Sequence, residues 1–321
     1  MNNLEQLVVD LRKSLGIVHK QDIRIVDRAL ELSNSSIAVG DDCAAIPDGD
    51  GYLLFAAEGM WDVLVEEDPW FAGWCAVMVN ISDIAAMGGR AIALVDTIWT
   101  EDRTKALPLL EGMKAASQAF NVPIVGGHTN LKSRFNSLGV SILGRANKLI
   151  SSFTAQPGDL LVVAVDLAGE MHPQFPFWNA ATQYQADKSP ANLLQRKLEI
   201  LPFLAENNLC QTGKDISMGG IIGTLLMLIE SSQCGAILDL DRVIYPENIE
   251  LATWLTSFPS YGYLLAISTN NLDAVQEKFS SEEIDCFAVG KITNSSQLIV
   301  SYQTEEQVFW DFQRQGKILY S

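Results

Sequence analysis

The spacing of apolar residues along the first half of the chain alternates between helical and extended periodicity. Over residues 68–87, Trp70, Trp74, Val77 and Ile81 recur at intervals of three or four, which places them on one face of an amphipathic helix. Helices are predicted over residues 5–32, 68–87 and 103–120. Short apolar runs predict strands over residues 52–57, 91–99, 122–127 and 137–144.

The second half shows the same alternation without repeating the residues themselves. Helices are predicted near residues 190–207, 219–231, 247–257 and 271–280. Strands are predicted over residues 160–167, 236–240, 263–268, 287–292 and 297–302. Because each helix has to bury its apolar face against a sheet, each half is expected to form a mixed α/β or α+β lobe. Residues 151–159 have the turn chemistry of a junction, so the predicted domains are residues 1–152 and 153–321.

Composition and charge limit the classes of partner. The 321 residues are 48% hydrophobic, which is enough for two compact cores. With 22 basic and 39 acidic residues, the net charge is −17, which repels nucleic acid and anionic membranes. An anionic nucleotide remains compatible if Mg²⁺ screens it and backbone N–H groups surround it. The cysteines contain no CxxC pair and no apolar run reaches membrane-spanning length, so a cytoplasmic location with reduced thiols is expected.

Two acidic motifs in the first half have the composition of a divalent metal site. Asn80 and Asp83 are three residues apart in a predicted helix, so both side chains can reach one ion or phosphate, with a solvated helix face as the alternative. Asp41 and Asp42 are adjacent, and adjacent side chains of an extended segment point in opposite directions. Both reach one ion only if the chain turns, which Gly40 permits. An Asp-rich surface turn is the alternative.

A glycine-rich segment in the first half is a candidate for phosphate contact. This segment, residues 125–130, follows the start of a predicted strand, and Gly126 and Gly127 there allow backbone N–H groups to approach an anion. Thr129 adds a hydroxyl group. His128 is either a contact residue or a loop histidine that only forms hydrogen bonds.

A second glycine-rich segment opens a predicted helix in the second half. Asp215 and Ser217 precede Gly219, where a carboxylate beside helical N–H groups can hold a metal–phosphate complex, and Lys214 is a candidate phosphate contact. Equally, Asp215 or Ser217 only caps the helix. No strand is predicted before these glycines, so a dinucleotide-binding fingerprint is not expected, and no P-loop motif occurs.

In their order along the chain, these motifs resemble those of the AIR synthase (PurM-like) superfamily. The specific strings are GDDCA at residues 40–44 and NISDIAAMGG at residues 80–89, and the resemblance extends from about residue 37 to residue 302. That superfamily includes aminoimidazole ribonucleotide synthetase, thiamine-monophosphate kinase, selenophosphate synthetase and the hydrogenase maturation dehydratase. The resemblance implies a two-domain α+β fold. Its N-terminal ATP-binding domain would complete a barrel across a homodimer, and its C-terminal domain would enclose Mg·ATP from the other side.

The resemblance and the motifs together assign a role to individual residues. The predicted metal ligands are Asp41, Asp42, Asp83 and Asp215. The predicted nucleotide-binding residues are Glu58, Asn80, Gly126, Gly127, His128, Thr129, Ser217 and Gly219. The predicted catalytic residues are Lys214 and Asp215.

Departures from the better-known members determine which activity is expected. His128 and Met218 occupy positions where thiamine-monophosphate kinases usually carry Asp. The reactive cysteines of the selenophosphate synthetases and of the dehydratase have no counterpart. The sequence therefore predicts an AIR synthase-related, Mg²⁺-dependent enzyme that transfers the γ-phosphoryl group of ATP to an oxygen of a small molecule. A kinase similar to thiamine-monophosphate kinase and a non-catalytic nucleotide-binding subunit are the alternatives.

Overall fold

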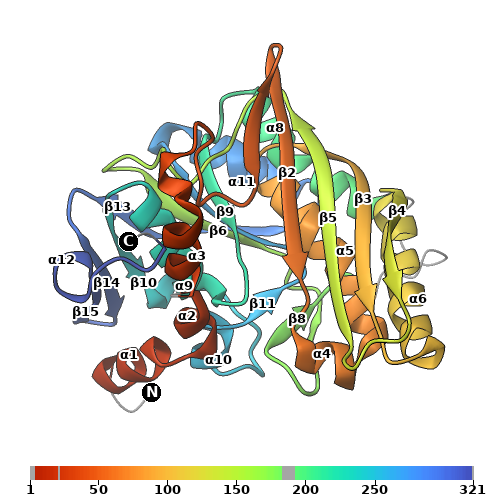
Figure 1. Cartoon of the computed structure of the whole chain (residues 1–321). Coiled ribbons are helices and arrows are strands. Elements are labelled where there is room, and N and C mark those ends of the chain that lie inside the picture. Colours follow the sequence, from red (N-terminus) through yellow and green to blue (C-terminus); the bar gives the residue numbers. More distant parts are fainter. Residues whose placement is uncertain (1–3, 21, 183–191, 320–321) are drawn as a thin grey trace. The chain divides into compact units, whose positions relative to one another are not determined.

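The computed structural model describes residues 4–20, 22–182 and 192–319 (Figure 1). Their contacts group the chain into two compact units. The first unit comprises residues 1–41, 150–183 and 207–321, and the second comprises residues 42–149 and 184–206. The two units therefore do not coincide with the predicted domains, which meet near residue 152, because the N-terminal segment packs with the second half of the chain.

The second unit is built on a five-stranded sheet in the order β1-β2-β5-β3-β4 (Figure 1). Its strands are β1 (Ala44–Asp48), β2 (Gly51–Gly59), β3 (Arg90–Trp99), β4 (Ile124–Asn130) and β5 (Ser137–Ala146). Its helices are α4 (Asp62–Glu67), α5 (Pro69–Ala86), α6 (Arg103–Phe120), α7 (Leu193–Leu198) and α8 (Ile200–Glu206). Only β3 and β4 run parallel among these neighbours. Over the described residues the sheet has two edges and does not close into a barrel.

Local sequence signals explain the two long helices of this unit. The side chain of Asp68 accepts a hydrogen bond from the N–H of Phe71, and Pro69 occupies the first turn of α5. Asp102 caps α6 in the same way, through the N–H groups of Thr104 and Lys105. Both helices confirm the predicted ranges to within a residue or two.

Strand β5 shows how this unit forms its core. Leu138, Val140 and Ile142 are buried, whereas the residues between them are only partly buried. This period of two places the buried residues on one face of the sheet, and α5 packs on that face. The opposite face carries exposed apolar side chains.

The first unit contains a seven-stranded sheet in the order β15-β14-β10-β13-β6-β12-β9 and a small sheet in the order β11-β8-β7. The strands are β6 (Leu160–Val165), β7 (Glu170–Met171), β8 (Phe177–Asn179), β9 (Thr212–Asp215), β10 (Gly235–Asp239), β11 (Phe258–Pro259), β12 (Gly262–Ile267), β13 (Asp285–Thr293), β14 (Gln297–Tyr302) and β15 (Glu305–Asp311). Its helices are α1 (Leu4–Arg12), α2 (Leu15–Lys20), α3 (Ile23–Leu30), α9 (Gly220–Ser231), α10 (Leu251–Leu255), α11 (Leu272–Ser280) and α12 (Phe312–Gln315). The short 3-10 helices are η1 (Leu32–Asn34), η2 (Leu240–Arg242) and η3 (Thr269–Asn271).

Helix α9 lies in the core of this unit. All twelve of its residues are buried, and it packs against β9, β10, β12 and α10. A helix that is apolar on every side is expected to be buried in this way. Its burial fixes the position of the glycine-rich segment at its start. None of the helices that the structure describes is long and apolar enough to cross a membrane.

Candidate metal centre

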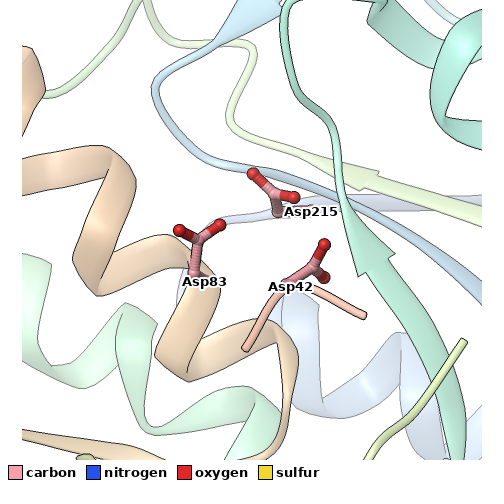
Figure 2. A group of neighbouring side chains, drawn as sticks. All are labelled: Asp42, Asp83 and Asp215. Carbon is pink, nitrogen blue, oxygen red and sulfur yellow. The ribbon is translucent and has the colours of Figure 1, made fainter. Parts of the chain in front are cut away.

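Two carboxylates of the second unit lie close together. Asp83 is on the last turn of α5 and is only 6% exposed, and Asp42 precedes β1 (Figure 2). A carboxylate oxygen of Asp42 lies within 4.8 Å of one of Asp83. Two negative charges at that separation repel each other by about 3.5 kcal/mol at an effective dielectric constant of about 20. The negative end of the α5 dipole adds to this cost, so the pair has the charge and the oxygen ligands that suit a divalent cation.

The neighbouring Asn80 is buried rather than solvated. It is 0% exposed, and its Nδ2 donates to the backbone oxygen of Ala76 at 2.8 Å. Its Oδ1 has no hydrogen-bond partner among the described residues. The alternative of a solvated helix face is therefore wrong for Asn80 and Asp83. A nucleotide contact by Asn80 stays a prediction.

Asp41 and Asp42 have different surroundings. Gly40 adopts a positive φ of 115°, which provides the turn that the glycine was expected to permit. The carboxylate of Asp41 accepts hydrogen bonds from the Oγ of Ser151 at 2.7 Å and from the N–H of Ser152 at 3.0 Å. Both aspartates are only partly exposed. Asp41 therefore anchors the chain within its own unit, and Asp42 is the member of the pair that approaches Asp83.

Strand β9 of the first unit carries Lys214 and Asp215, which are 5% and 6% exposed. Figure 2 shows the carboxylate of Asp215. The Nζ of Lys214 donates to the backbone oxygen of Gly40 at 3.5 Å. The expectation that no strand precedes these glycines is wrong, because β9 pairs with β12. The sequence of β9 is too polar to predict a strand. It is a strand because it pairs with its neighbour in the sheet.

The start of α9 is not capped by a side chain. Its N-cap residue is Gly219, and the alternative that Asp215 or Ser217 caps it is therefore wrong. Instead, the N–H of Ser217 donates to the Oγ1 of Thr224 at 3.3 Å, and that hydroxyl donates to the backbone oxygen of Asp215 at 3.3 Å. The Oγ of Ser217 is buried without a hydrogen-bond partner among the described residues.

The glycine-rich segment of the first half lies in a strand, as predicted for residues 122–127, and only the loop expected at His128 is wrong. Residues 124–130 form the edge strand β4, parallel to β3. A Cβ on Gly127 would overlap the carboxylate of Asp96, whereas a Cβ on Gly126 would have nothing within 4 Å. Only Gly126 therefore leaves open space beside the backbone.

The remaining predicted residues lie on the same sheet. The ring of His128 is 6.0 Å from that of Trp99, centroid to centroid, and His128 is exposed. Thr129 lies opposite Ile98 in β3 and is also exposed. Glu58 is exposed near the end of β2, opposite Val140.

Asp96 was not singled out from the sequence. It lies opposite Gly127 in the sheet, and burial raises the pKa of its carboxyl group. The signal that could have identified it is a carboxylate inside the apolar run at residues 91–99, because burying a charge is costly.

Family models identify the chain. The model of the AIR synthase related protein, N-terminal domain, matches residues 40–146, and that of the C-terminal domain matches residues 156–303. The chain therefore belongs to the AIR synthase related family. An uncharacterised protein of Synechocystis is 49% identical to this chain, and the match covers 97% of both proteins. The thiamine-monophosphate kinase of Pyrococcus horikoshii is 27% identical, over 66% of this chain and 69% of that protein.

Solved structures share the fold at low sequence identity. T. maritima PurL complexed with ADP has a TM-score of 0.70 and 18% identity, covering 88% of this chain and 47% of that one. The chain therefore spans about half the length of PurL. AaThiL complexed with AMPPCP and TMP has a TM-score of 0.67 and 17% identity, covering 89% of this chain and 94% of that one.

Proposed function

We propose that this protein uses Mg²⁺ and ATP to transfer the γ-phosphoryl group to an oxygen of a small molecule. The observation that carries this proposal is the buried Asp83 with a carboxylate oxygen of Asp42 within 4.8 Å. Thiamine-monophosphate kinases are among the relatives, and structures with the same fold hold ADP or AMPPCP. These likenesses support nucleotide binding by the present chain.

We infer that Asp215 is the third ligand, because chain connectivity favours it. Gly40 accepts a hydrogen bond from Lys214, which directly precedes Asp215. Asp42 is two residues after Gly40, and consecutive Cα atoms are about 3.8 Å apart, so Asp42 lies close to Gly40. The contact between Gly40 and Lys214 thus supports a single cation held by Asp42, Asp83 and Asp215.

The other predicted residues complete the proposed site. A bound Mg²⁺ would neutralise charge on the phosphates. Gly126 provides open space beside its backbone, and Thr129 and His128 on the same exposed strand are proposed nucleotide contacts. Lys214 is proposed to contact the phosphates. Its ammonium group is buried, and its positive charge attracts them although the net charge of the protein is negative. Phosphoryl transfer requires mainly this positioning and charge neutralisation.

Calorimetric titration with ATP, with and without Mg²⁺, tests the proposal. Asp83→Asn keeps the shape of the side chain and removes its charge, so the Mg²⁺-dependent part of the affinity should fall at least on the order of tenfold. The matched control is Asp50→Asn, which removes the same charge from a fully exposed side chain. Equal ATP affinity with and without Mg²⁺ in the wild type would contradict the proposal, as would an unaffected Asp83→Asn variant.

A non-catalytic nucleotide-binding subunit is the second candidate. It is favoured by Met218, which is 46% exposed in the glycine-rich segment and cannot serve as an oxygen ligand for Mg²⁺. Measuring ATP turnover against a panel of small hydroxylated metabolites separates the two candidates. Binding without turnover above background would support the subunit, and turnover that Asp83→Asn abolishes would support the enzyme.

We also propose that the protein is a homodimer formed through the open face of the five-stranded sheet. Ile46, Phe55, Val95 and Leu143 are 39%, 50%, 42% and 37% exposed, and the strand register places them on the face opposite α5. Adjoining exposed apolar side chains on one face are typical of an interface. Phe55→Glu should give a monomer by light scattering with an unchanged circular dichroism spectrum. A wild-type monomer would refute this.

A further inference from the structure

Residues 216–219 connect Asp215, the last residue of β9, to the start of α9, and both elements belong to the same unit. Asp215 is the proposed third ligand of the cation. Ser217, within the connection, has a buried hydroxyl group without a hydrogen-bond partner among the described residues. A ligand side chain holds a cation best when the groups behind it are already fixed. The contacts that fix this connection therefore bear on the proposed site.

The peptide bond between Asp215 and Ile216 is held from both sides. The N–H of Ile216 donates to the backbone oxygen of Gly262 in β12 at 2.9 Å. Because the N–H and C=O of a trans peptide point in opposite directions, the carbonyl of Asp215 points away from β12. In the described sheet, β9 is an edge strand, so no further strand pairs on that side. The Oγ1 of Thr224 donates to this carbonyl at 3.3 Å and takes the place of such a strand.

The same hydroxyl group also holds Ser217, whose N–H donates to the Oγ1 of Thr224 at 3.3 Å. Thr224 is 0% exposed, and the other residues of α9 from Gly220 to Ile229 are apolar. A buried hydroxyl group is costly unless it is hydrogen-bonded, whereas valine has almost the same shape and carries no such cost. Packing in the core therefore does not account for a threonine at this position. Its two hydrogen bonds to the connection do.

Helix α2 contacts the other end of the connection and lies beside α9 (Figure 1). A Cβ on Gly16 would overlap the backbone oxygen of Met218 and would lie 2.8 Å from the Cα of Gly219. The close approach of the two backbones therefore requires glycine at residue 16. A Cβ on Gly223, by contrast, would make an ordinary contact of 3.6 Å with the Cγ1 of Ile17. The connection is thus held by a hydroxyl group at one end and by a backbone contact at the other.

We propose that Thr224 and Gly16 are positioning residues of the cation site. Neither residue touches the ion. Together they fix residues 215–219, so that the carboxylate of Asp215 and the hydroxyl group of Ser217 are in place before the cation binds. This inference rests on the part of the proposed function that makes Asp215 a cation ligand.

Binding of Mn²⁺ without ATP, followed by the loss of the free-ion signal in electron paramagnetic resonance, tests the proposal. Mn²⁺ accepts the same carboxylate ligands as Mg²⁺. Thr224→Val keeps the shape of the side chain and removes both hydrogen bonds, so it should weaken Mn²⁺ binding about tenfold. Thr224→Ser keeps the hydroxyl group and should restore wild-type affinity.

A pair of glycine variants tests the opposite end of the connection. Gly16→Ala should weaken Mn²⁺ binding, because the added methyl group displaces the backbone of Met218. The matched control is Gly223→Ala, which has room for the methyl group and should bind like the wild type. Urea denaturation of every variant measures folding separately. A purely structural role would lower stability and leave the Mn²⁺ affinity of the folded protein unchanged.

Three results would overturn the inference alone. The first is wild-type Mn²⁺ affinity in Thr224→Val and Gly16→Ala while Asp83→Asn binds weakly. The second is equal loss in Thr224→Ser and Thr224→Val, and the third is equal loss in Gly223→Ala and Gly16→Ala. A wild type that binds no Mn²⁺ would refute the cation site and this inference with it. Failure of the ATP titration alone would refute the proposed function and leave the Mn²⁺ results intact.

Discussion

The adjacent glycines of β4 allow a paired test of the structure and of the proposed nucleotide site. A Cβ on Gly127 would overlap the Oδ1 of Asp96 and would lie 2.7 Å from its Cγ. It would also overlap the backbone oxygen of Asp96, which cannot rotate away. Gly127→Ala therefore requires β4 to move relative to β3. Gly126→Ala requires no movement, since nothing lies within 4 Å of its Cβ position.

The expected stabilities of the two variants follow from these contacts. Inserting a methyl group where there is no space costs about 1–3 kcal/mol, so Gly127→Ala should lower the free energy of unfolding by that amount. In a strand, alanine is more favourable than glycine by about 0.5–1 kcal/mol, so Gly126→Ala should be neutral or slightly stabilising. The two variants should therefore differ by about 1–4 kcal/mol.

Urea denaturation followed by circular dichroism measures this difference, provided that both variants keep the wild-type m-value. Calorimetry with Mg·ATP then separates folding from function. If the backbone at Gly126 approaches a phosphate, the added methyl group in Gly126→Ala should weaken ATP binding several-fold in a fully stable protein.

Two outcomes would refute this reasoning at different points. Equal stability of Gly127→Ala and wild type would show that the contact with Asp96, and with it the register between β3 and β4, is wrong. Unchanged ATP affinity in Gly126→Ala would leave the fold intact and remove Gly126 from the nucleotide site.

Three further predictions concern ionisation and the C-terminal segment. The hydrogen bond from Arg90 lowers the pKa of Glu206. The contribution of this interaction to the free energy of unfolding is therefore fully present above about pH 4.3, the pKa of an unfolded glutamate, and is lost as the pH falls through the folded-state pKa. Urea titrations should show Glu206→Gln up to about 1 kcal/mol less stable at pH 7, a small difference because the pair is partly exposed, and equally stable in strong acid. Burial raises the pKa of Cys210 to about 12, so a thiol reagent at pH 8 should modify it far more slowly in native than in unfolded protein, and equal rates would contradict its burial. The carboxylate of Glu230 accepts hydrogen bonds from the N–H groups of Ile318 at 2.7 Å and Leu319 at 3.0 Å. Glu230→Ala should therefore cost about 1–3 kcal/mol and speed release of the C-terminal residues by carboxypeptidase, and unchanged release would contradict the anchoring.

Elements with strong local signals could be predicted from the sequence. Helix α6 covers the predicted residues 103–120, because its periodicity and the Asp102 cap are both local properties. Strand β5 was predicted for a similar reason, its alternating apolar residues. The strands missed, including β1 and β9, are short and rich in polar or small residues, and they are strands because neighbouring strands pair with them.

The amino-acid sequence by itself determined the family, the inventory of carboxylates and glycines, and the main helices, since these depend on residue type and spacing along the chain. Only the tertiary structure decided how the aspartates are used. Asp41 bonds to Ser151 and Ser152, whereas the adjacent Asp42 approaches Asp83 from a different part of the chain. It also decided that Asn80 is buried. Such proximity arises from many weak packing contacts between distant segments, which no local pattern encodes.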